Sequence, residues 1–104
     1  MLIINDPIAQ IALKLFYEGY FIQNRMSNFK RERELQIGTG SKHKLLIAEI
    51  DYEMFVLYID GDRENGFVFE LHHLDDLPRN IEVYCNAYAK AMEIDYESIF
   101  KFKQ

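Results

Sequence analysis

The sequence predicts a small α+β domain with an N-terminal helix, a four-stranded antiparallel β-meander and a C-terminal helix packed on the sheet. Three patterns lead to this prediction. Apolar residues recur at helical spacing near both ends of the chain, strand-like segments joined by short links fill the middle, and residues 54–59 are apolar throughout. A strand apolar at every position must be covered on both faces, so we place it inside the sheet.

The two expected helices have recognisable starts. Asp6 can accept hydrogen bonds from free N–H groups, proline suits the first helical position, and Gly19 offers a left-handed stop, so the first helix should span 7–18. The second helix should span 78–92, because acids precede a proline and apolar residues follow at helical spacing. Residues 95–104 are expected to form a short helix.

The four expected strands are 29–37, 44–50, 54–60 and 67–74. The last three expected strands are joined by links that are short enough only for hairpins, and this indicates an antiparallel meander. The link 51–53 has no glycine, so the register there stays open by one residue. Residues 38–42, GTGSK, are expected to form a plain turn, because Ser41 precedes Lys42 and a strand follows, unlike a phosphate-binding loop.

Length and composition indicate one soluble domain over residues 1–104. Its single cysteine, Cys85, cannot form an internal disulfide, and the start MLIINDP lacks a secretory signal. No apolar run approaches the roughly 20 residues that a membrane helix needs. We therefore expect a cytoplasmic protein that has no contact with a membrane.

Charge is distributed unevenly within the net charge of −5. Residues 1–48 carry seven Lys or Arg and four acids, whereas residues 49–100 carry three and thirteen. Such an asymmetry acts on the choice of partner and on the rate of encounter more than on folding.

The sequence offers little that indicates catalysis or a cofactor. Cys85 falls on the apolar stripe of the second helix and should be buried, and no histidine is spaced to activate it. The loop from Asp60 to Gly66 has acids at calcium-loop positions, but its glycine comes one position late and Leu71 replaces the bidentate glutamate. We expect neither an enzyme nor a cofactor.

His72 and His73, followed by Asp75 and Asp76, supply residue types that bind metals. In a strand, however, adjacent side chains point to opposite faces. The two imidazoles are therefore expected not to share an ion, and no metal site is predicted.

A basic stretch between residues 25 and 44 supports an alternative, nucleic-acid binding. The glutamates at 32 and 34 interrupt it, and the acidic remainder of the chain would repel phosphate groups. The residues for this alternative are Arg25, Lys30, Arg31, Arg33, Lys42 and Lys44.

The preferred interpretation is a non-enzymatic protein-binding module. Small acidic inhibitors and immunity or anti-defence proteins of bacteria and phages share its size and charge, and it would dock on a basic, even nucleic-acid-binding, partner surface. Apolar residues on both sheet faces suggest that one face meets a partner or a second copy. A secretion-type chaperone or adaptor is a further alternative. The predicted partner-binding residues are Asp60, Asp62, Glu64, Glu70, Asp75, Asp76, Phe55, Leu57 and Ile59.

Overall fold

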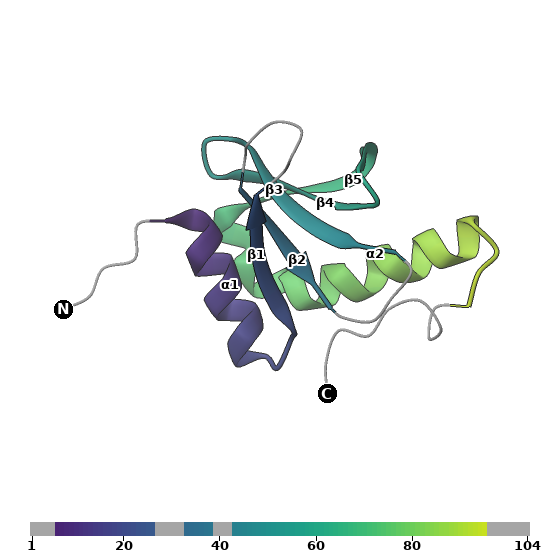
Figure 1. The fold of residues 1–104 in the computed structure, drawn as a ribbon, viewed down its shortest axis with the longest axis horizontal. Helices are drawn as coiled ribbons and strands as arrows, with labels where there is room; N and C mark the ends of the chain where they lie inside the picture. Colours follow the sequence, from purple (N-terminus) through teal and green to yellow (C-terminus); the bar gives the residue numbers. More distant parts are fainter. Residues whose placement is uncertain (1–5, 27–32, 39–42, 96–104) are drawn as a thin grey trace.

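The computed structural model describes residues 6–26, 33–38 and 43–95 and confirms the α+β class. A helix, an antiparallel sheet and a second helix follow one another along the chain (Figure 1). The elements are α1 (Pro7–Tyr17), β1 (Ile22–Met26), β2 (Arg33–Ile37), β3 (Leu45–Asp51), β4 (Met54–Ile59), β5 (Asp62–Glu70), the 3-10 helix η1 (Leu71–Asp76) and α2 (Leu77–Ala91).

The sheet formed by the described strands has five members, not the expected four, in the order β1-β2-β3-β4-β5. The additional strand is β1, which pairs antiparallel with β2 from Ile22 opposite Ile37 to Met26 opposite Arg33. Its sequence, IQNRM, is largely polar, and a strand at the edge of the sheet can accommodate such residues. Residues 29–32 of the expected strand, most of the turn at 38–42, and nearly all of the expected helix at 95–104 lie outside the described residues.

The last strand also differs from the expected segment 67–74. β5 begins at Asp62 and ends at Glu70, and residues 71–76 form η1 instead of continuing the strand. Its register with β4 shifts, since Leu57 pairs with Phe67 whereas Ile59 pairs with Asp62. The intervening residues of β5, Arg63 to Gly66, lie opposite Tyr58 alone and form an irregular bulge.

α1 and α2 pack on the same face of the sheet, where the main core forms (Figure 1). At its centre are Phe55, Leu57 and Ile59, which are essentially inaccessible to solvent. The face predicted to meet a partner or a second copy is therefore the covered face, and these three residues cannot contact another molecule in the folded chain. The other buried members of this core are Ile8, Ile11, Leu15, Tyr20, Leu35, Ile37, Leu45, Ile47, Phe69, Leu77, Ile81 and Cys85.

The opposite face of the sheet carries a smaller buried cluster of Leu46, Ala48, Val56 and Tyr58. Beside it lies the buried carboxylate of Glu34, whose Oε2 accepts a hydrogen bond from the Tyr58 hydroxyl at 2.9 Å. Burial raises the pKa of Tyr58.

Arg63, on the β5 bulge, completes this polar group. Its Nη2 donates to the Tyr58 hydroxyl oxygen at 3.2 Å, and its guanidinium carbon lies 4.8 Å from the centre of the Tyr58 ring. Tyr58 thus links the bulge to β2 across the sheet.

Tyr58→Phe is expected to lower the free energy of unfolding by about 1–3 kcal/mol, because it removes a donor from the buried Glu34 carboxylate. Urea unfolding measures the change. Glu34→Gln in the Tyr58→Phe background should recover part of the loss, since a neutral amide is less unfavourable to bury than a carboxylate. Equal stability of wild type and Tyr58→Phe would contradict the described contact.

Candidate functional site

The predicted acidic residues divide between two ends of the sheet. In the pairing of β4 with β5, Ile59 lies opposite Asp62 and Met54 lies opposite Glu70. Asp60, Asp62 and Glu64 therefore gather at the hairpin end, and Glu70, with Asp75 and Asp76 of η1, gathers at the other end. They do not form one continuous acidic surface.

A pocket of about 400 Å³ lies at the hairpin end, between the β5 bulge and the C-terminal half of α2. β5 contributes a carboxylate and an amide, α2 contributes two phenol rings and two methyl groups, and the residue after α2 contributes a thioether. The lining residues are Asp62, Asn65, Tyr84, Ala87, Tyr88, Ala91 and Met92.

Hydrogen bonds hold the polar wall of this pocket in place. The Tyr84 hydroxyl donates to the Asn65 carbonyl at 3.0 Å and so ties α2 to the bulge. Within the bulge, the Asn65 side-chain amide donates to Asp62 Oδ2 at 2.8 Å. Glu64 stands beside them, exposed to solvent.

The pocket combines neutral phenols with negative charge. Burial, reinforced by charges that include the Asp62 carboxylate, raises the pKa of Tyr84 to about 12. Burial also raises the pKa of Tyr88, and Asp60 and Asp62 add to this effect. Both phenols are therefore protonated near neutral pH, and the nearby carboxylates favour a positively charged ligand.

The Asp60 carboxylate also contacts the residues that precede β3. Its Oδ1 accepts a hydrogen bond from the Lys44 backbone N–H at 2.8 Å, and its Oδ2 lies 2.5 Å from His43 Nδ1. The His43 ring in turn meets the Tyr88 ring edge to face, with centroids 5.9 Å apart. Asp60 thus fixes the start of β3 next to the pocket.

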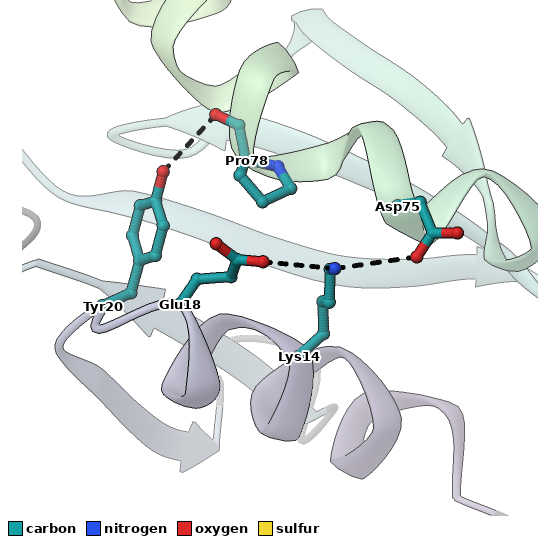
Figure 2. A network of polar contacts seen from close by, with 5 residues as sticks. All are labelled: Lys14, Glu18, Tyr20, Asp75 and Pro78. Atoms are coloured by element: carbon teal, nitrogen blue, oxygen red, sulfur yellow. Dashed lines mark hydrogen bonds and ion pairs between the residues drawn. The ribbon is translucent and has the colours of Figure 1, made fainter.

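The acids at the far end are partly engaged in joining α1 to η1 and α2 (Figure 2). Lys14 Nζ lies 3.3 Å from Glu18 and 3.6 Å from Asp75, and the Tyr20 hydroxyl donates to the Pro78 carbonyl at 3.4 Å. Asp75 is almost fully exposed, so its ion pair adds little stability. Asp76 is also exposed and precedes α2.

The basic residues of the nucleic-acid alternative are not brought together where the structure describes them. Arg25 lies on the Tyr58 face and donates to Gln36 Oε1 at 2.9 Å, whereas Arg33 lies on the helix face and pairs with Asp6, the residue that caps α1. Lys44 precedes β3 at the other end of the sheet. Lys30, Arg31 and Lys42 lie outside the described residues.

Cys85 is fully buried in the main core, as expected from its place on the apolar stripe of α2. Burial raises the pKa of its thiol to about 12, so the thiolate needed for nucleophilic chemistry is suppressed.

Comparisons with protein-family models, with curated proteins and with solved structures found no significant match to this chain. Among the described residues, no helix combines the length and apolar character needed to cross a bilayer. The grounds for a functional proposal are therefore the fold and the chemistry of its surface.

Proposed function

We propose that this protein is a non-enzymatic protein-binding module that docks on a basic surface of a partner protein. The observation that carries the proposal is the pocket between β5 and α2, with Asp62 in one wall and Tyr84 and Tyr88 in the other. The chain has the small size and the acidic net charge of small inhibitors and of immunity or anti-defence proteins, and this is the class of protein that we favour.

The pocket suits the side chain of an arginine or lysine from the partner. The Asp62 carboxylate would pair with the cation, and the phenol rings of Tyr84 and Tyr88 offer π faces that attract it. Ala87, Ala91 and Met92 would contact the aliphatic part of that side chain.

Exposed apolar side chains extend this surface along both elements. Phe67 follows the bulge on β5, Val83 lies one helical turn before Ala87 on α2, and Met92 is at the end of the pocket. Aromatic residues and methionine are enriched in protein–protein interfaces. A phosphate backbone would gain nothing from them and would be repelled by Asp60, Asp62 and Glu64.

The proposal predicts that Asp62→Asn combined with Glu64→Lys will weaken binding to the partner about tenfold or more, mainly by slowing association. The amide introduced at position 62 keeps an oxygen that can accept from Asn65, so the melting temperature should change little. The partner is first captured from the source cells with the wild-type chain and then purified, and surface plasmon resonance at two salt concentrations measures the rates.

Glu82→Lys is the charge control, which raises the net charge by two, against three in the acid variant. Glu82 is exposed on α2, at helical positions opposite those of Tyr84, Tyr88 and Ala91, so this reversal changes the net charge without touching the pocket. It should leave the affinity within about twofold of wild type. If both variants lost the same affinity for the partner, the effect would come from overall charge and not from the pocket. If Asp62→Asn with Glu64→Lys bound nucleic acid more strongly than wild type, nucleic-acid binding would be the favoured function.

A further inference from the structure

At the opposite end of the sheet from the pocket, three side chains of metal-binding type converge. Glu70 ends β5, and His72 and His73 lie in η1 immediately after it. One potential ligand atom from each residue lies within 4.8 Å of the others. The His72 Nε2 and Glu70 Oε2 atoms are 3.1 Å apart, and the two imidazole centroids are 4.0 Å apart.

His72 and His73 were expected to point to opposite faces of a strand, but they lie in η1, which is a 3-10 helix. In a 3-10 helix consecutive side chains diverge by about 120° instead of the 180° of a strand. The backbone of His73 departs from helical values, with φ −96° and ψ 20°. The Leu71 N–H donates to the Glu53 carbonyl at 2.9 Å and holds this turn against the β3–β4 link.

We propose that Glu70, His72 and His73 form a binding site for a divalent transition-metal ion of the zinc type. Two imidazole nitrogens and one carboxylate oxygen are a ligand set that zinc accepts, whereas magnesium and calcium prefer oxygen ligands alone. Three protein ligands leave a position of a tetrahedral ion open to water. This site is independent of the proposed protein-binding function.

The required adjustment is small and occurs at the surface. Ligand atoms around a tetrahedral zinc ion at about 2.0 Å are separated by about 3.3 Å, so the side chains need only rotate inward. The side chains of His72 and Glu70 are 69% and 47% exposed, which leaves them room to do so. Ordering exposed side chains opposes binding, and we therefore expect a dissociation constant in the micromolar range rather than the tight binding of structural zinc.

The charges around the site favour a dication. Glu53, Asp75 and Asp76 are exposed on the β3–β4 link and on η1, next to the three ligands. Their combined negative potential raises the local concentration of cations. The Lys14 ammonium pairs with Asp75 and offsets part of this potential.

The test is isothermal titration calorimetry, in which zinc chloride is titrated into the tag-free, metal-stripped full chain. We expect one ion per chain, and each of His72→Ala, His73→Ala and Glu70→Gln should weaken binding about tenfold or more. Cobalt(II) titrated in place of zinc should give visible absorption bands that report imidazole ligation and that disappear in the histidine variants.

Two controls keep the result interpretable. Melting temperatures measured in chelator should be the same for wild type and the three variants, because the replaced side chains are on the surface. His43→Ala changes the histidine beside Asp60, at the other end of the sheet, and should bind zinc like wild type. Absence of zinc binding in the wild type, or zinc binding that survives His72→Ala with His73→Ala, would overturn the proposal.

Discussion

Replacing Phe55 with alanine is expected to lower the free energy of unfolding by about 3–5 kcal/mol. Phe55 is completely buried near the start of β4, and its ring stacks on Phe69 with centroids 5.6 Å apart. The substitution removes the whole ring and leaves a cavity that strands on both sides of β4 hinder from collapsing. A domain of this size has about 5–15 kcal/mol of stability, so the loss is a large share.

Val68→Ala provides the comparison, since Val68 lies in neighbouring β5 with its side chain about half exposed. Its effect should stay within about 0.5 kcal/mol. Denaturant unfolding of both variants separates the two positions. If Phe55→Ala instead kept its stability and lost partner binding, Phe55 would belong to an open surface, as the sequence had suggested, and the described core would be wrong.

The helices could be predicted closely from the sequence because their signals are local. α1 begins at Pro7 after Asp6, whose carboxylate accepts a hydrogen bond from the Ile8 N–H at 3.1 Å, as the capping argument requires. Proline near the start and apolar residues at helical spacing likewise defined α2. Such information lies within a few residues, so it needs no knowledge of the rest of the chain.

Residues 67–70 of β5 were predicted as strand, but β1 and the first part of β5 could not be predicted because tertiary pairing decides them. β1 is polar, and only its pairing with β2 makes Ile22–Met26 a strand. In β5 the acidic and amide residues before Gly66 resemble a loop, yet they belong to a bulged strand. Both faces of β4 are indeed buried, as its sequence indicated, but which face lies under the helices depended on long-range packing.

The candidate site was half visible in the sequence. The acids of the β4–β5 hairpin stand out as a cluster, but their neighbours Tyr84 and Tyr88 come from a helix some twenty residues later. Their four-residue spacing, repeated at Met92, is a usable signal, although in the sequence alone it is typical of a helix stripe that faces a core. Both tyrosines are partly exposed, so the apolar stripe of α2 extends beyond the part of the helix that packs on the core.

Gly66 controls whether the bulge can form the pocket wall. A Cβ atom added at this position would lie 2.5 Å from Val56 Cγ2 and 2.9 Å from the Leu57 carbonyl oxygen. The side-chain contact could shift, but the backbone oxygen belongs to the central strand and cannot move without disturbing the pairing of β4. Glycine is thus required by close approach of two backbones, in the element that also presents Asp62 and Asn65.

Gly66→Ala is therefore expected to lower the free energy of unfolding by about 2–3 kcal/mol. It should also move the bulge away from α2, break the hydrogen bond from the Tyr84 hydroxyl to the Asn65 carbonyl and expose the Tyr84 ring to solvent. Because burial is the main cause of the raised Tyr84 pKa, that pKa should fall from about 12 towards that of an exposed tyrosine. Urea unfolding and the absorbance of tyrosinate at high pH measure the two effects. Gly61→Asn is the control: Gly61 has open space around it, and asparagine tolerates its φ of +85°, so less than about 1 kcal/mol should be lost. If Gly66→Ala matched wild type in both measurements, the bulge would not approach β4 as described, and the pocket wall would need a different origin.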